Sequence, residues 1–219
     1  MSAIRKALVG GSALIAVLAA AGCSTNGASK ATSEPKGEPD VVAYEADYPS
    51  FDSIDEVIKK SDVIVRGTVM GSRVEEMRPE ASTGGDPASD PQAGLSPEEA
   101  AEAEPVVVTV STVKVSAVLS GDVAVGDTVE VSQLGGTLGG VTYRDKTTTF
   151  LAKGSTEYVL LLADHGSKAP YDLLNPEQAL YTVKPGARVE PVSEGGFDNV
   201  GEVGRLAAKA EKIKKSDRR

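Results

Sequence analysis

The stretch "PVVVTVSTVKVSAVL", residues 105–119, decides the fold. Val106, Val108 and Val110 share one phase of the alternation, whereas Val113, Val115, Ala117 and Leu119 share the opposite phase. Because successive side chains of a strand point to opposite faces, this change of phase near Ser111 and Thr112 indicates an inserted residue, hence a β-bulge. At about 3.3 Å per residue, the strand is too long for a flat edge in a small domain. The stretch therefore predicts a strongly bent strand of the kind that closes a small barrel.

The residues before this stretch predict a short helix followed by a strand. In "SFDSIDEVIKKSD" (50–62), Ser53 and Glu56 form a capping box at the start of an apolar helical period. The next segment, "DVIVRGTVMGSRV", alternates as a strand, and Gly67 and Gly71 interrupt it as bulges or bends would.

The residues after the central stretch predict further strands. "TVEVSQL" (128–134) alternates, and "EYVLLLAD" (157–164) is continuously apolar, as in a strand buried on both faces. A ribbon is expected between "VTYRD" (141–145) and "TTTFLA" (147–152). "LYTV" and "ARVEPV" flank "KPGA" (184–187), which suits a type II turn and closes a hairpin.

These elements together predict one mainly β domain over residues 51–193. We expect a small OB-like five-stranded bent barrel with a short N-terminal helix, an additional hairpin and a C-terminal helix; a β-sandwich is the alternative. The core must be aliphatic, because the 219 residues include no tryptophan and three phenylalanines. The net charge of −9 argues against nucleic-acid binding, which requires a basic surface.

Two charged segments frame this domain prediction. Residues 75–104 carry nine acids, four prolines and a single basic residue, Arg78, which predicts a disordered acidic insertion between strands. It is either solvated and inert or a site for a cation or basic partner. Residues 198–219 predict a basic C-terminal helix capped by Asn199 and Glu202. Its cations are either solvated or attracted to anionic lipid headgroups.

The N-terminus resembles a bacterial export signal. Residues 1–22 combine Arg5 and Lys6 with an apolar run that ends at Cys23, the only cysteine. "LAAAGC" resembles the lipobox of bacterial lipoproteins. The resemblance implies cleavage before Cys23, a diacylglycerol thioether on its sulfur and an anchor on the extracytoplasmic face of the cell membrane. Residues 23–50 would form a flexible tether. The alternative is an ordinary secretory peptide that leaves Cys23 as a free thiol.

No residue pattern identifies a reaction centre, a metal site or a cofactor site. His165 is the only histidine, and neither H-E-x-x-H nor G-x-S-x-G occurs. The glycine-rich "GGTLGG" (135–140) lacks the Lys-Ser/Thr of a phosphate loop and is expected to form turns. The sequence thus favours a non-enzymatic binding module, with an envelope hydrolase that uses His165 as the alternative.

The order of predicted elements over residues 61–163 resembles the OB-like barrel of netrin-type and metalloproteinase-inhibitor modules. In those inhibitors, an N-terminal cysteine packed on the barrel reaches the protease zinc. Here the predicted barrel has no cysteine, so the resemblance supports the fold but counts against the inhibitor mechanism. A protease-inhibitor module is kept as a further alternative. The Ala-, Gly- and Val-rich composition suits an actinobacterium. The partner, an envelope protein, a glycan or a small ligand, and the oligomeric state are left open.

Overall fold

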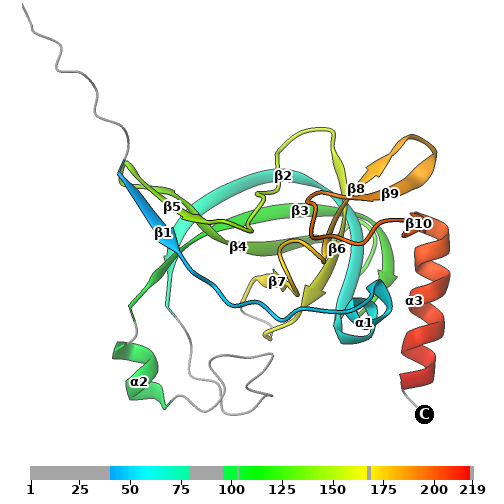
Figure 1. Cartoon of the computed structure of the whole chain (residues 1–219), viewed down its shortest axis with the longest axis horizontal. Helices are drawn as coiled ribbons and strands as arrows, with labels where there is room; N and C mark the ends of the chain where they lie inside the picture. The colour runs from blue at the N-terminus through cyan, green and yellow to red at the C-terminus, as the bar shows by residue number, and fades with distance from the viewer. Residues whose placement is uncertain (1–39, 79–95, 103, 167–168, 218–219) are drawn as a thin grey trace, which may run out of the picture. The chain divides into compact units, whose positions relative to one another are not determined.

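The computed structural model describes residues 40–78, 96–102, 104–166 and 169–217, which belong to one compact unit, residues 38–219 (Figure 1). This unit is mainly β with a partly closed ring of strands, which confirms the predicted fold class. Among the described residues, no helix has the length and apolar character needed to cross a membrane.

The elements follow one another along the chain with these bounds: β1 (Val41–Tyr44), α1 (Ile54–Lys60), β2 (Val63–Met77), α2 (Pro97–Glu102), β3 (Val106–Ser120), β4 (Thr128–Leu138), β5 (Val141–Asp145), β6 (Glu157–Ala163), β7 (Tyr171–Leu173), β8 (Leu180–Lys184), the 3-10 turn η1 (Pro185–Ala187), β9 (Arg188–Pro191), β10 (Gly201–Glu202) and α3 (Val203–Asp217).

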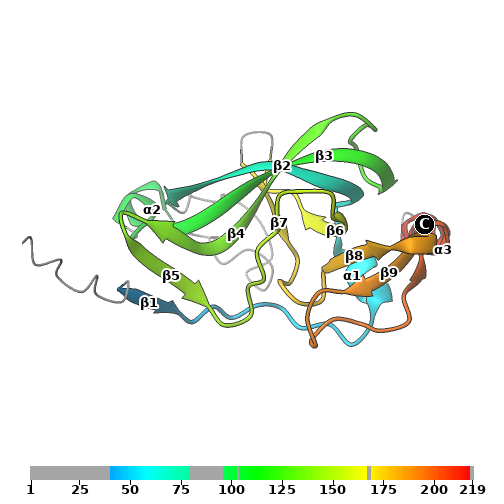
Figure 2. The same cartoon turned by 90° about the horizontal axis from the view of Figure 1, so that it is seen from above.

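Five strands close the ring in the order β2, β3, β4, β7, β6 and back to β2. All neighbours are antiparallel except β4 and β7, which run parallel. Figure 2 shows the long strands β2, β3 and β4 side by side. β1 and β5 extend the sheet beyond β4, and β8, β9 and β10 extend it beyond β6. The ring is therefore the predicted five-stranded, OB-like barrel with additional strands on both sides.

The long strand β3 is bent as predicted, but the extra residue near its middle lies in the partner strand. Val69 pairs with Val113 and Gly71 with Thr112, so Met70 of β2 is the unpaired residue. Met70 is 56% exposed, which shows that the bulge turns it outward. The prediction of an insertion in β3 at this point was wrong. A phase change reveals a shift in register, yet either strand of the pair can carry the additional residue.

The core is built around β6. Its residues Tyr158–Leu162 are all buried, because β6 lies between β2 and β8 and is covered on both faces. Val63, Ile64 and Val65 of β2 pair directly with its three leucines. The predicted central strand is therefore confirmed. Burial of this aliphatic cluster supplies the main stabilisation of the ring.

The predicted ribbon forms with a different partner. β5 pairs with the end of β4, not with residues 147–152, which form no strand. The side chain of Gln133 explains the difference, because its Oε1 accepts a hydrogen bond from the amide of Leu151 (2.8 Å) and its Nε2 donates to the carbonyl of Thr149 (2.8 Å). These bonds satisfy the loop backbone without a strand partner. The second predicted hairpin, β8–β9, is present, with Gly186 at φ 79° as a type II turn requires.

Three predicted boundaries differ from the structure. β1 lies within the predicted tether 23–50. The ends of the predicted acidic insertion, residues 75–104, contain the last three residues of β2 and the helix α2. The C-terminal helix begins at Val203, because the preceding Gly201 and Glu202 pair with β9 as β10. Residues 1–39, with Cys23 and the predicted signal, and residues 79–95 lie outside the described chain.

Candidate functional site

His165, the candidate base, lies in the loop that follows β6. Its Nε2 is 3.0 Å from Oδ2 of Asp172 in β7. The other oxygen of this carboxylate, Oδ1, accepts a hydrogen bond from the hydroxyl of Ser132 in β4. Because Ser132 and Asp172 are also paired in register, the three side chains gather where β7 closes the ring. We call Ser132, His165 and Asp172 the polar seam.

The order of groups in the polar seam does not suit nucleophilic catalysis. A serine hydrolase places the histidine between the serine and the carboxylate, so that the imidazole takes the hydroxyl proton. Here the carboxylate of Asp172 lies between the other two side chains. The hydroxyl of Ser132 therefore donates its hydrogen bond to the carboxylate of Asp172, and the imidazole of His165 does not accept it. Ser132 is also 8% exposed, which leaves little access for a substrate.

A second polar cluster forms where β5 ends. Asp145 is 2% exposed, and its Oδ1 accepts hydrogen bonds from the hydroxyl and the amide of Thr147. Burial alone would raise the pKa of Asp145, but the hydrogen bonds to its carboxylate outweigh burial and lower the pKa below its ordinary value. The carboxylate therefore stays ionised and holds the loop that begins here.

The segment between β1 and α1 is fixed on the barrel. Asn175 donates from Nδ2 to the carbonyl of Pro49 (2.9 Å), and Gln178 exchanges two hydrogen bonds with the backbone of Phe51 (2.9 and 3.0 Å). Tyr48 lies near the carboxylates of Asp145 and Asp172, and burial raises the pKa of its phenol. Residues 40–51 thus belong to the folded domain.

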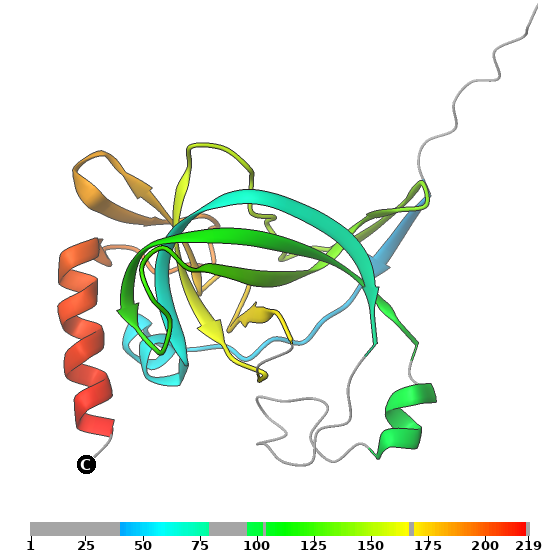
Figure 3. The same cartoon turned by 180° about the vertical axis from the view of Figure 1, so that it is seen from behind.

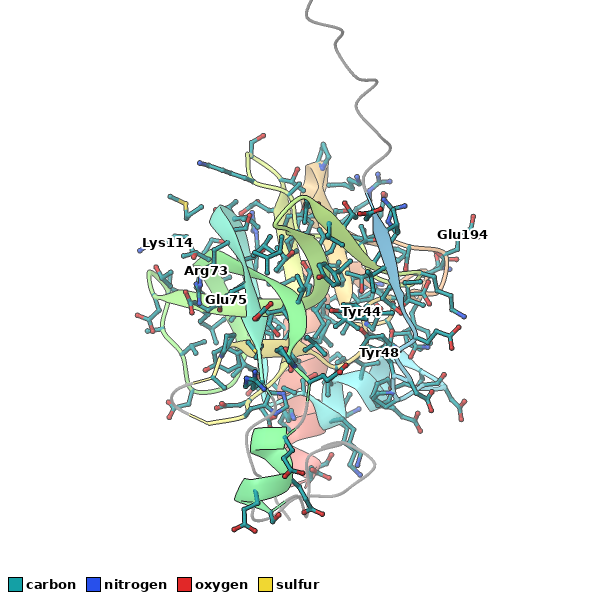
Figure 4. The ribbon with its side chains drawn as sticks, turned by 90° about the vertical axis from the view of Figure 1, so that its left-hand side faces the viewer. Tyr44, Tyr48, Arg73, Glu75, Lys114 and Glu194 are labelled. Atoms are coloured by element: carbon teal, nitrogen blue, oxygen red, sulfur yellow. The ribbon has the colours of Figure 1, made fainter. Side chains whose placement is uncertain are left out.

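A pair of stacked tyrosines ties β1 to β5. The rings of Tyr44 and Tyr143 lie 5.7 Å apart at an angle of 28°, and the hydroxyl of Tyr44 accepts a hydrogen bond from the amide of Val107 (2.9 Å). Figure 4 shows Tyr44 and Tyr48 on one side of the domain, with Arg73 and Glu75 together on the other side of that view. Both tyrosines contribute to holding the N-terminal segment.

The first two glycines of the stretch 135–140 allow close packing of strands. A Cβ atom on Gly135 would lie 2.6 Å from the carbonyl oxygen of Tyr143, and one on Gly136 would lie 2.7 Å from Oγ1 of Thr109. The close approach is thus to the chain's own backbone and side chains. The sequence predicted turns for this stretch, but residues 135–138 form the end of β4, and only Gly139 and Gly140 form a turn.

The C-terminal helix offers a different surface, a shallow groove beside α1. Its lining residues are Asp55, Arg205, Ala208, Lys209, Lys212, Ile213 and Ser216. Three of them are cationic, and the one carboxylate, Asp55, is 2.6 Å from the Nζ of Lys209. The groove therefore carries more positive than negative charge and suits an anionic ligand. Figure 3 shows α1 and α3 beside one another at this position.

No protein-family model and no curated protein matches this chain.

The described residues contain no group of three or more His, Cys, Asp or Glu side chains that could hold a metal ion. Of the residues singled out from the sequence, His165 and the cations of the C-terminal helix have a defined setting, whereas Cys23 lies outside the described residues. Ser132 and Asp172 were missed. They are 40 residues apart and belong to no motif, and the parallel pairing of β4 with β7 that brings them together carries no sequence signal.

Proposed function

We propose that this protein is a lipid-anchored protein on the extracytoplasmic face of the cell membrane, and that its barrel binds a partner without transforming it. The anchor is the diacylglycerol thioether that the "LAAAGC" resemblance implies for Cys23. The barrel is a compact, well-packed domain whose described residues begin at Asp40, 17 residues after this cysteine. The partner is an envelope protein, a glycan or a small ligand, and the surface of the domain determines which of these it binds.

One observation carries the choice of binding over catalysis. Asp172 lies between Ser132 and His165, so the only histidine of the chain contributes to closing the ring. A hydrolase that used His165 would need the imidazole to accept the proton of a nucleophile directly. The alternative of a protease-inhibitor module needs a cysteine packed on the barrel, and the described residues include none.

A fluorophosphonate probe, which reacts with activated serines, tests this proposal. We expect Ser132 of the purified full-length protein to stay unlabelled, because its hydroxyl donates to a carboxylate. The Ser132→Ala variant is the matched control. Labelling of the wild type at Ser132 that disappears in this variant and in His165→Ala would establish a hydrolase and contradict the proposal.

A protease-binding measurement addresses the inhibitor alternative. Secreted metalloproteases titrated with the purified protein should retain full activity if the barrel acts as a general binding module. Stoichiometric inhibition would overturn our assignment in favour of the inhibitor class.

A further inference from the structure

The outward face of α3 carries a row of cations. Arg205, Lys212 and Lys215 are exposed, and Lys209 is half-buried beside them. With 3.6 residues per turn, the four lie away from the buried residues by which α3 packs on the barrel. No packing requirement of the barrel explains this face, because these cations are directed to solvent.

Few acids offset this charge. α3 contains two acids, and one of them, Asp217, pairs with Lys59 of α1 at 3.2 Å. The other is Glu211, which is exposed on the flank of the helix. Across the groove, Asp55 neutralises Lys209. Three exposed cations, Arg205, Lys212 and Lys215, therefore keep an excess of positive charge on a chain whose net charge is −9.

The shape of this face suits a surface contact. The groove between α1 and α3 is open, with a volume of roughly 470 Å³, and its largest apolar residue, Ile213, is half-buried against the core. Helices that insert between lipid chains carry bulky apolar residues toward the membrane, which this face lacks. A layer of anionic groups is the partner that matches a shallow cationic face without bulky, exposed apolar residues.

We propose that this face of α3 docks on the anionic headgroup surface of the membrane that holds Cys23. The inference rests on the proposed lipid anchor, since electrostatic attraction fades within about 8 Å at physiological ionic strength. The chain between Cys23 and β1 spans at most about 60 Å, so the anchor keeps the domain within reach. Figures 1 and 2 place β1 and α3 at opposite ends of the sheet. Docking of α3 would therefore orient the barrel along the membrane, so that the same side of the barrel always faces partners.

Lysine acetylation, followed by mass spectrometry, tests the docking with the full acylated protein. The protein is reconstituted in vesicles of phosphatidylcholine alone, or of phosphatidylcholine and phosphatidylglycerol in equal parts. We expect the labelling of Lys212 and Lys215 to slow by about five-fold or more in the anionic vesicles. The reason is that each cation near an anionic surface strengthens binding to that surface by about five-fold. Lys146 and Lys153, exposed on loops of the barrel, are internal references whose rates should stay the same.

Charge reversal provides the matched variants. Arg205→Glu combined with Lys212→Glu should restore rapid labelling of Lys215 in anionic vesicles. Lys146→Glu combined with Lys153→Glu makes the same change of charge elsewhere and should retain the slow rate. All four side chains are exposed, so the fold should tolerate both variants.

Two outcomes would overturn the inference. Equal labelling of Lys215 in the two kinds of vesicle would show that α3 does not dock. Equal slowing by inorganic phosphate without vesicles would assign the groove to a soluble anion instead of a membrane. The mass of the N-terminal peptide in the same sample reports acylation of Cys23, so failure of the anchor and failure of the docking are distinguished.

Discussion

The ring closes at two seams of different chemistry. Between β2 and β6, six residue pairs are in register, and valines and an isoleucine face leucines in the buried core. Between β4 and β7, two pairs are in register, and Asp172 links Ser132 with His165. The comparison teaches that buried aliphatic side chains dominate one closure of the ring, where Arg66 of β2 also pairs with Glu157 of β6, whereas side-chain hydrogen bonds dominate the other closure. The lone histidine therefore has a structural role before any catalytic role needs to be invoked.

The largest expected effect concerns the apolar seam, which is the pairing of Val63–Val65 in β2 with Leu160–Leu162 in β6. Leu161 is fully buried where β6 lies between β2 and β8, so Leu161→Ala leaves a cavity in the core. We expect a loss of about 2–5 kcal/mol in the free energy of unfolding, measured by urea denaturation. Val125→Ala, at a residue that is 66% exposed, is the control and should change stability by less than about 0.5 kcal/mol. A loss below about 1 kcal/mol for Leu161→Ala would mean that this seam does not dominate.

An alkaline titration sharpens the comparison on the same side of the ring. Tyr181 pairs with β6, and burial raises the pKa of its phenol to about 12. A raised pKa means that stability is fully present below pH 10, the ordinary value, and is lost as the pH rises toward 12. The expected loss over this window is about 2–3 kcal/mol.

Tyr181→Phe is the control for the alkaline effect. The variant removes the ionising hydroxyl, which donates to the carbonyl of Gln178 (2.9 Å), so it should unfold more easily at neutral pH but show a shallower decline above pH 10. An unchanged slope in this variant would assign the alkaline loss to other groups.

A smaller effect is expected at the polar seam. Asp172→Ala removes the acceptor of Ser132 and the partner of His165, and leaves the buried hydroxyl without its bond. Because the carboxylate is partly exposed, we expect a loss of about 1 kcal/mol. Hydrogen exchange should accelerate at the amides of β7 while β6 stays protected. Asp122→Ala, at an exposed loop residue, should leave both unchanged. Equal loss of protection in β6 and β7 would contradict the separation of the two seams.

The apolar part of the barrel could be predicted from the sequence because its strands are rich in valine and leucine at regular positions. The period of residues 105–119 and the apolar run 157–164 locate β3 and β6, and the capping box at Ser53 locates α1. The position of the bulge could not be predicted from the sequence, because a phase change in one strand does not show which of the two paired strands holds the extra residue.

The remaining elements depend on contacts that no local pattern records. β1 was missed because Val41 and Val42 stay exposed, so no apolar period marks the strand. The polar seam joins residues from three elements, and its geometry follows from ring closure alone. Of the predicted site residues, His165 could be named from the sequence, whereas its partner, Asp172, and hence its role, required the fold.

The most direct test of the account concerns Cys23, because both the proposed location and the docking of α3 depend on it. The intact protein should be purified from membranes of its native host, or of a bacterium with the lipoprotein pathway, and its N-terminal peptide analysed by mass spectrometry. We predict a chain that begins at Cys23 and carries a diacylglycerol thioether, and a Cys23→Ser variant without acyl groups. A mature chain that retains an unmodified Cys23, or that begins elsewhere, would contradict the account.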